Sequence, residues 1–271
     1  MPARRSARRT MTALAAGAAV AAAAWLGGAT AVAAPGDGPV ATAPGVHPGV
    51  QTRTDGAQCT ANFLFTDGDA TYLGQAAHCS GTGASTETDG CTSASLPLGT
   101  QVEVGGASRP GTLVYNSWLA MQDAGETDPD ACAYNDLALV RLDPADAATA
   151  SGVVPIFGGP RGIDTDGTRP GDVVRSYGNS ELRGGVTLLS PKIGTSAGDR
   201  GHGWSHDVVT VTPGIPGDSG SAFLSPDGSA LGVLSTIQFA PVPASNGVSD
   251  LAKMLGYARG HGMGGLRLVT G

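Results

Sequence analysis

The stretch CTANFLFTDGDATYLGQAAHC, Cys59–Cys79, contains two short apolar runs separated by the turn TDGDA and ends with a histidine beside a cysteine. Apolar runs of this length around a glycine-containing turn are typical of a β-hairpin. His78, near the end of this stretch, has three candidate roles: metal ligand, buried core residue or catalytic base. One residue cannot distinguish them, so the answer depends on what the rest of the chain supplies.

The composition of the whole chain favours a folded protein built from β-strands. Of the 271 residues, 41% are hydrophobic and 14% are charged, which argues against a disordered polymer. The 43 glycines and the small aromatic fraction of 5% indicate many turns and closely approaching backbones. We therefore expect an all-β fold, a barrel or a sandwich, and not a helical bundle.

Short apolar runs separated by Gly, Asp and Ser continue this pattern along the chain. The further strand candidates are residues 101–104, 112–115, 137–142, 173–176, 208–212, 221–224 and 231–236. One helix is predicted, in the segment SDLAKMLGYARG, where apolar residues recur at helical spacing from Leu251 to Ala258. Ser249 is its candidate N-cap, and Gly260 marks its end.

The first 33 residues have the three parts of a secretory signal peptide, namely a basic head, an apolar middle and a small-residue end. Cleavage after Ala33 fits the small residues of the sequence AVA. The span Met11–Ala33 is also long enough to cross a bilayer, but its alanines and glycines give it little hydrophobic drive, which disfavours a retained anchor. We expect a secreted, extracellular protein. The export route stays open, because the residues after Arg8 and Arg9 do not complete a twin-arginine pattern.

Residues 34–57 are rich in Pro, Gly, Ala and Thr and have no apolar period, so we expect an extended leader or a short pro-segment. No long linker or internal repeat divides residues 58–271, which we expect to form one domain. Removal of residues 1–33 leaves 12 basic and 23 acidic residues, a net charge of −11. Phosphate backbones and anionic lipids repel such a chain, so we expect no nucleic-acid partner and no stable membrane association after signal cleavage.

Four cysteines, Cys59, Cys79, Cys91 and Cys132, are an even number in a chain that carries an export signal. Two disulfides are the default expectation, and the sequence permits three pairings. A zinc site is the alternative, but the chain has no C-x-x-C pair and no histidine pair at helical spacing beside these cysteines.

The segment TPGIPGDSGSAFL, Thr212–Leu224, places Ser219 on a short glycine-flanked turn between two strand-like runs. Gly217 and Gly220 allow close approach of a substrate to the backbone and tolerate positive φ. Backbone N–H groups on such a turn can form an oxyanion hole, and the candidate donors are those of Gly217 and Ser219. The alternative is an ordinary surface turn. An α/β-hydrolase elbow is disfavoured, because position 221 is Ser where that motif has Gly.

A serine hydroxyl needs a base and an orienting carboxylate to become a nucleophile. His78 is the best base, because the other histidines lie in the leader, in the tail or in the segment GHGWSHD. A metal pair in that segment, His202 with His206, is disfavoured because glycines argue against a helix there. The carboxylate candidate is Asp136 in YNDLALVRLD, at the start of an apolar strand. If this carboxylate is buried, an imidazole N–H would supply the hydrogen bond that it needs. The alternative is that Asp136 is only a turn residue at the start of the strand.

The motifs AAHC, NDLALVRL and GDSGSA, in the order His, Asp, Ser, resemble those of the chymotrypsin-like serine proteases. The stretch Cys59–Cys79 is especially similar to the secreted bacterial branch of streptogrisin and α-lytic type. The resemblance covers most of residues 58–260. It implies two antiparallel six-stranded β-barrels with the active site between them, the first at about residues 58–150 and the second, with the terminal helix, at about 151–271.

The resemblance also implies a role for each motif residue. His78 is similar to the general base, Asp136 to its orienting partner and Ser219 to the nucleophile, with Gly217 and Ser219 as oxyanion-hole donors. Cys59 and Cys79 resemble the disulfide that holds the histidine loop, which leaves Cys91 with Cys132. Ser235, in GVLSTI, resembles the serine behind the catalytic aspartate.

These roles imply a serine endopeptidase that acts through an acyl-enzyme intermediate and needs no metal or cofactor. Protein or peptide substrates and a monomeric state are expected. Two other functions stay open: a non-catalytic binding protein on the same fold, and an esterase with the same triad.

Departures from the family pattern bear on specificity. Relatives that cut after Lys or Arg have an acid where this chain has Pro213, and relatives that cut after glutamate have a histidine where it has Leu234. We therefore expect an apolar or small residue in the primary pocket, whose walls would include Ile215 and Thr236.

Two further features lack a family counterpart. No IVGG-like start supplies a new N-terminus for Asp218, so this carboxylate either pairs with an internal arginine or caps its own turn. The segment between His78 and Asp136 carries the acidic stretch at residues 123–130. We expect a solvated acidic loop there, with calcium as the alternative, although the ligand order fits no EF-hand.

Overall fold

A computed structural model describes residues 45–84, 86–238 and 245–271. The predicted signal peptide, and the predicted leader as far as residue 44, lie outside these residues. In the described part of the chain, no helix is long and apolar enough to cross a membrane.

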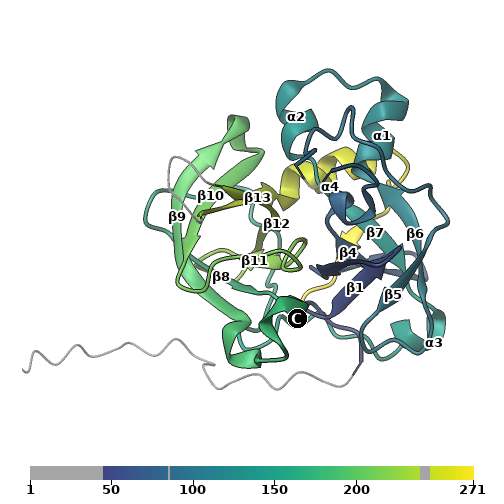
Figure 1. The fold of residues 1–271 in the computed structure, drawn as a ribbon, viewed down its shortest axis with the longest axis horizontal. Coiled ribbons are helices and arrows are strands. Elements are labelled where there is room, and N and C mark those ends of the chain that lie inside the picture. Colours follow the sequence, from purple (N-terminus) through teal and green to yellow (C-terminus); the bar gives the residue numbers. More distant parts are fainter. Residues whose placement is uncertain (1–44, 85, 239–244) are drawn as a thin grey trace, which may run out of the picture. The chain divides into compact units, whose positions relative to one another are not determined.

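The N-terminal half, with one strand from the C-terminal end of the chain, forms an antiparallel sheet, drawn mainly from purple to teal in Figure 1. Its eight strands lie in the order β14-β3-β4-β7-β6-β5-β1-β2. Strands β3 and β4 are the predicted hairpin, which turns between Asp67 and Ala70. The strand bounds are β1 Gln51–Thr54, β2 Ala57–Thr60, β3 Leu64–Asp67, β4 Ala70–Gln75, β5 Gln101–Val104, β6 Gly111–Asn116, β7 Ala138–Arg141 and β14 Arg267–Leu268.

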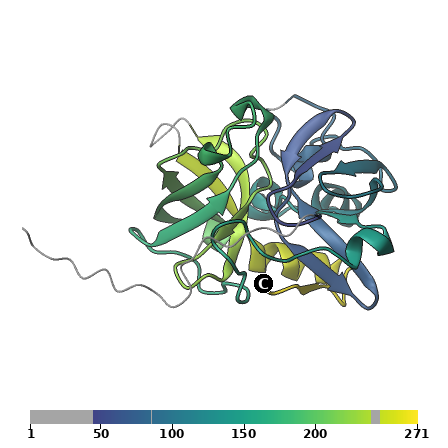
Figure 2. The same cartoon turned by 90° about the horizontal axis from the view of Figure 1, so that it is seen from below.

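The C-terminal half forms a closed barrel of six strands in the order β10-β13-β12-β11-β8-β9, drawn in green in Figure 1. Its own core contains Val174, Val208, Phe223, Leu231, Leu234 and Val248. The strand bounds are β8 Val173–Tyr177, β9 Pro191–Arg200, β10 Ser205–Thr210, β11 Ala222–Leu224, β12 Ala230–Gln238 and β13 Ser245–Asp250. Figure 2 shows the sheet and the barrel next to each other from a second side.

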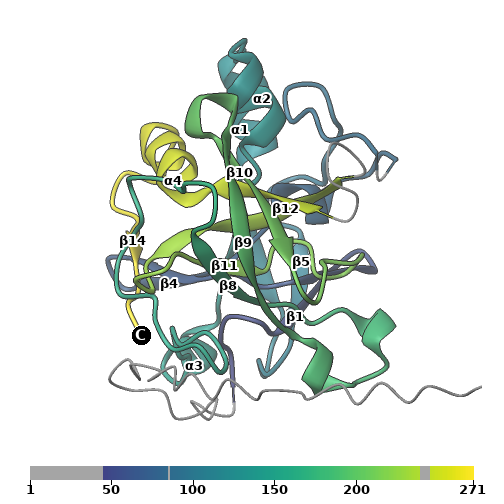
Figure 3. The ribbon, with the colours of Figure 1, turned by 90° about the vertical axis from the view of Figure 1, so that its left-hand side faces the viewer.

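Among the described residues there are four α-helices, of which the sequence predicted one. That one, α4 (Leu251–Gly260), is confirmed, but its N-cap is Asp250, whose carboxylate accepts the N–H of Lys253, and not Ser249. The others are α1 (Ser117–Ala124), α2 (Pro129–Tyr134) and α3 (Pro144–Ala147). They were not predicted because each is too short to show an apolar period. Helices α1 and α2 lie at one end of the sheet and α3 at the opposite end (Figure 3).

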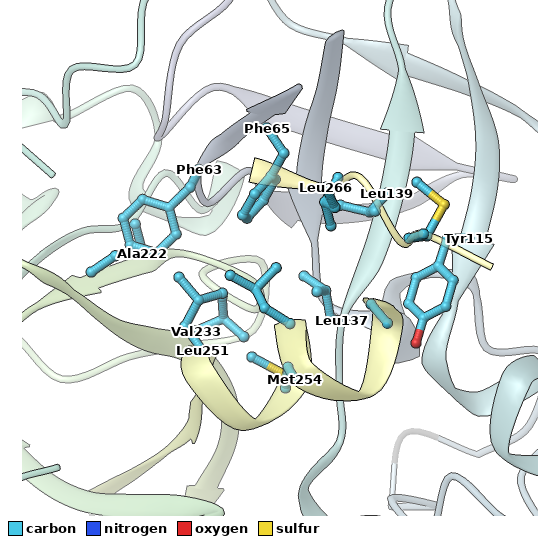
Figure 4. Packing of buried hydrophobic residues seen from close by; sticks show 14 of the residues in the cluster. Phe63, Phe65, Tyr115, Leu137, Leu139, Ala222, Val233, Leu251, Met254 and Leu266 are labelled. Atoms are coloured by element: carbon cyan, nitrogen blue, oxygen red, sulfur yellow. The ribbon is translucent and has the colours of Figure 1, made fainter. Parts of the chain in front are cut away.

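The sheet and the barrel share one apolar core, which α4 completes. Phe63 and Leu137 come from the N-terminal half, Val233 from the barrel and Leu251 and Met254 from the helix, and all five are fully buried. Figure 4 shows these side chains pointing into one cluster. Because burial of apolar surface is the main favourable term in folding, the two halves stabilise each other through this core.

Residues before the predicted domain start at residue 58 also take part in the fold. Strand β1 pairs with β2 and with β5, and Val46 and Val50 are buried in the core of the N-terminal sheet. The inward positions of β1 are Thr52 and Thr54, so its buried face has no apolar residues that would mark a strand.

The predicted fold class is confirmed, with a difference in the N-terminal half. The sheet there has eight strands and not six, and one of the two additional strands is β14, at the C-terminal end of the chain, which pairs with β3. Two residues give no period that a sequence argument can detect.

Candidate active site

His78 lies on η1 (Ala77–Ser80), a single 3-10 turn that follows β4. The disulfide between Cys59 and Cys79 ties this turn to β2, and so confirms the first predicted pairing. The buried side chain of Gln75, at the end of β4, donates to the hydroxyls of Thr54 and Ser80. The turn is therefore fixed on both sides of the histidine, whose ring stays 25% exposed.

Asp136 contacts His78 twice. Its Oδ2 lies 2.7 Å from the ring Nδ1, and its Oδ1 accepts the backbone N–H of His78 at 2.9 Å. Because an ionised carboxylate only accepts, Nδ1 carries the proton, and Nε2 of a neutral ring is left as a proton acceptor. The structure thus brings together two residues that lie 58 positions apart in the sequence.

The contact shifts the pKa of both groups. Burial alone would lower the pKa of His78, but the Asp136 charge and hydrogen bond outweigh it and raise this pKa above the ordinary 6.5. Burial alone would raise the pKa of Asp136, but the charge and hydrogen bonds of His78 and the Ser235 hydroxyl lower it. Asp136 therefore stays ionised beside a histidine that titrates above its usual range.

Ser235, on β12, donates its hydroxyl to Oδ2 of Asp136 at 2.6 Å. The same oxygen faces His78, so the carboxylate is held from two directions. Asp136 precedes β7 of the sheet, whereas β12 belongs to the barrel. The site is therefore built across the two halves of the molecule.

The turn that carries Ser219 packs against the strand segments that lead to His78. The carbonyl of Ser219 accepts the N–H of Thr60 at 2.9 Å, and the N–H of Gly220 donates to Leu234 at 2.7 Å. A Cβ at Gly220 would lie 2.9 Å from the backbone N of Ala76, two residues before His78, so only glycine fits there. Both Ser219 and His78 are among the described residues, and no hydrogen bond joins the serine hydroxyl to the ring.

Two N–H groups of this turn belong to peptide groups whose carbonyls are hydrogen-bonded within the protein. The carbonyl of Pro216 accepts the Ser180 hydroxyl at 2.6 Å, and the carbonyl of Asp218 accepts the Ser221 N–H at 3.0 Å. In a trans peptide the N–H points opposite to the carbonyl. The N–H of Gly217 therefore points away from Ser180 and that of Ser219 away from the N–H of Ser221, and neither donates a hydrogen bond within the described part of the chain.

Asp218 is fully buried, and its carboxylate has both of the expected kinds of contact. It pairs with Arg183, and it accepts the N–H of Ile215 at 3.1 Å, which closes the turn. A second cation was not predicted: Nζ of Lys192, on β9, lies 2.9 Å from Oδ2. The N–H of Ser180 donates to the other carboxylate oxygen at 3.1 Å. Four contacts thus hold the residue that precedes Ser219.

No protein-family model matches the chain, and no curated protein sequence matches it. Among solved structures, protease A of Thermobifida fusca matches at a TM-score of 0.52 and 19% identity, over 84% of this chain and 100% of that one. A structure described as a Glu endopeptidase in complex with MPD matches at 0.52 and 14%, over 82% and 94% of the two chains. A glutamic acid specific serine protease described as using a histidine triad in substrate binding matches at 0.50 and 22%, over 79% and 98%. The chain has the chymotrypsin-like fold.

Between His78 and Asp136 the chain contains strands β5 and β6 of the sheet and, after them, the helices α1 and α2. The disulfide Cys91–Cys132 closes a loop within this segment, which confirms the second predicted pairing. Its acidic residues have local partners: Glu126 accepts the N–H groups of Thr127 and Asp128, and the Asp128 side chain accepts the N–H of Asp130 at the start of α2. Two groups of three potential metal-ligand side chains occur among the described residues. One of them, Asp89 with Cys91 and Cys132, lies in this segment, where both cysteines form the disulfide, and neither group includes a residue of the acidic stretch 123–130.

The two histidines of the GHGWSHD segment have different surroundings. His202 is exposed and pairs with Asp130 at 2.5 Å. His206 is fully buried in the barrel, with one ring nitrogen 2.7 Å from Asp199 and the other 3.0 Å from Asp250. Burial opposes protonation of His206, but these hydrogen bonds raise its pKa. Each histidine thus has its own carboxylate partners, and no group of three potential metal ligands among the described residues contains either of them.

Several residues that contact the Ser219 turn were not predicted from the sequence. Gln58 and Thr60 bind the carbonyl of Gly217 at 3.1 and 2.7 Å, and Ser180 binds that of Pro216. Asn246, on β13, accepts the N–H of Gly214 at 2.9 Å. They are polar residues without a spacing signal, and each reaches the turn only because the chymotrypsin-like fold brings distant segments together.

Proposed function

We propose that the chain is a secreted serine endopeptidase with His78 as general base, Asp136 as its orienting partner and Ser219 as nucleophile. The observation that carries the proposal is the contact of Asp136 with His78 and Ser235 across the two halves, next to a turn that presents two free N–H groups. The fold, which it shares with structures of serine proteases, supports it. Buried carboxylates paired with a partly exposed histidine are typical of catalytic sites.

In this mechanism Nε2 of His78 removes the hydroxyl proton of Ser219 as the serine oxygen attacks a peptide carbonyl. The N–H groups of Gly217 and Ser219 stabilise the oxyanion that forms. His78 then gives the proton to the leaving amine, the C–N bond breaks, and an acyl-enzyme remains. Water repeats the same steps, with His78 again as base, and releases the acid. Every proton passes through one ring nitrogen, and no metal or cofactor takes part.

The decisive experiment is the substitution Ser219→Ala. We expect it to abolish both peptide hydrolysis and labelling by a fluorophosphonate probe, while mass mapping of the labelled wild type finds the probe on Ser219. The matched control is Ser221→Ala, since Ser221 is fully buried and its hydroxyl has no hydrogen-bond partner. Labelling that survives Ser219→Ala would place the nucleophile elsewhere.

Paired assays on casein and on a p-nitrophenyl ester separate the peptidase from the two alternatives. Hydrolysis of both supports the peptidase, hydrolysis of the ester alone supports an esterase, and hydrolysis of neither supports a binding protein. Secretion after cleavage at residue 33, and a monomeric state without stable membrane association, belong to the same proposal. N-terminal sequencing of the exported protein and its elution volume test them.

A further inference from the structure

The position of Asn246 bears on the size of the substrate side chain that the proposed peptidase accepts. Asn246 lies on β13 directly opposite Ile237 of β12, and Thr236, a predicted wall of the primary pocket, lies opposite Gly247. The other predicted wall, Ile215, follows Gly214, to which Asn246 is hydrogen-bonded. Asn246 therefore lies between the two walls.

The side chain of Asn246 fills the space beside Gly214. A Cβ at Gly214 would lie 2.8 Å from Nδ2 and 3.0 Å from Oδ1 of Asn246, and 2.9 Å from a methyl carbon of Leu234. On the other wall, a Cβ at Gly247 would lie 2.4 Å from the Thr236 hydroxyl. Such contacts are closer than ordinary packing allows for an added atom, so the side chains of Asn246 and Thr236 already fill the space beside these two glycines.

The wall cannot move back to make room. The carbonyl of Pro213 accepts hydrogen bonds from Arg183 and Lys192, each at 3.3 Å, and both cations pair with the buried Asp218. The N–H of Gly214 donates to Oδ1 of Asn246 at 2.9 Å. The wall segment is thus clamped between an ionic cluster and the asparagine.

We propose that Asn246 is a specificity-determining residue that restricts the primary pocket to small side chains, such as those of alanine, serine or valine. The inference rests on the proposed peptidase function and names its substrate class. Nδ2 of Asn246 has no hydrogen-bond partner among the described residues and is closed to solvent. The asparagine therefore occupies the space at the base and offers a substrate no open polar contact.

The test is a series of tetrapeptide p-nitroanilides that differ only in the residue before the cleaved bond: Ala, Val, Leu, Phe, Gln or Glu. For the wild type we expect kcat/KM to be at least about tenfold higher for Ala or Val than for Phe, since steric rejection of that size is common in apolar pockets. Asn246→Ala is expected to raise kcat/KM for Leu or Phe by about tenfold, with a change of less than about threefold for Ala.

Asn62→Ala is the matched control. Asn62 is fully buried too, its Oδ1 accepts a backbone N–H, from Phe63, and its Nδ2 also lacks a partner. It lies beside Gly74 in the N-terminal sheet, so its loss should leave the preference unchanged. Asn246→Ser provides a second variant if the alanine does not fold.

Three results would overturn the inference. A wild type that prefers Phe or Leu has an open pocket, and one that prefers Gln or Glu uses the Nδ2 donor for recognition. An unchanged preference in a folded Asn246 variant means that another residue sets the size limit. Failure of the proposed function looks different: the wild type would hydrolyse no member of the series and would not react with a fluorophosphonate.

Discussion

The segment that carries His78 and the turn that carries Ser219 lie side by side but are fixed by different interactions. The histidine segment depends on a disulfide, a hydrogen-bonded carboxylate and a buried glutamine side chain. The serine turn has no disulfide; it depends on a carboxylate with two cations in the barrel interior. One half of the site is held by a covalent link, and the other by buried charge.

This difference implies different costs of disruption. A disulfide acts mainly by restricting the unfolded chain, so its loss lowers stability chiefly through the unfolded state. A buried ion cluster is sensitive to the loss of one partner, because the remaining charges stay desolvated without compensation. The serine turn should therefore be the more fragile half of the site.

The largest effect is expected from Asp218→Asn. It removes the one carboxylate that, among residues 45–84, 86–238 and 245–271, pairs with Arg183 and Lys192, whose side chains are 7% and 0% exposed. We expect a loss of at least about 3 kcal/mol in the free energy of unfolding, measured by urea titration, and no detectable hydrolysis. The control is Asp143→Asn, which breaks the exposed pair with Arg109, keeps a good helix N-cap and should cost less than about 1 kcal/mol. Equal costs for the two variants would contradict the role of the buried cluster.

The disulfides give the next largest effect on hydrolytic activity. Replacement of Cys59 and Cys79 by serine opens a loop with a sequence separation of 20, and the chain-entropy estimate is about 3 kcal/mol. Opening Cys91–Cys132, with a separation of 41, should cost about 4 kcal/mol. At a temperature where both variants are folded, the first should lose most of its hydrolytic activity, because the pair adjoins His78. The second should keep its activity. A larger loss of activity in the second variant than in the first would show that the segment closed by Cys91–Cys132 supports the site.

The parts of the fold that were predicted from the sequence are those with local signals. The hairpin before His78, most strands of the barrel and α4 have apolar runs bounded by turn residues, and the structure contains them. The His78–Asp136 contact was predicted from motif order, since a buried carboxylate at a strand start needs a donor. Ser219 stays a prediction, because no contact of its hydroxyl with His78 is present.

Other parts depend on contacts between distant segments and left no local signal. Strand β1 buries threonines, so its inner face looks polar in the sequence. Lys192 lies in a strand with exposed neighbours, and nothing in that strand shows that its ammonium group reaches a carboxylate from a turn 26 residues later. Asn246 is similar, since its partner Gly214 lies on another element. Polar residues with tertiary partners need the three-dimensional structure to be found.

The smallest effect concerns the pH profile of the proposed peptidase. His78 must be neutral to accept a proton, and its pKa is raised above 6.5 by Asp136, so kcat/KM should fall as the pH decreases through this raised value. Ser235→Ala removes one donor from the oxygen of Asp136 that faces the ring. That oxygen then carries more uncompensated charge toward His78, so the protonated ring is favoured and the acidic limb should move to higher pH.

The shift caused by Ser235→Ala should be less than about one pH unit, because one hydrogen bond to a charged group is worth about 1.5–3 kcal/mol and solvent replaces part of it. Ser225→Ala is the control, since that buried serine donates its hydroxyl to Asp227 and not to Asp136. A limb that moves to lower pH would mean that Ser235 acts on His78 by another route. An unchanged limb with a lower kcat would mean that Ser235 only positions the carboxylate, and that the charge at Asp136 is set by His78 alone.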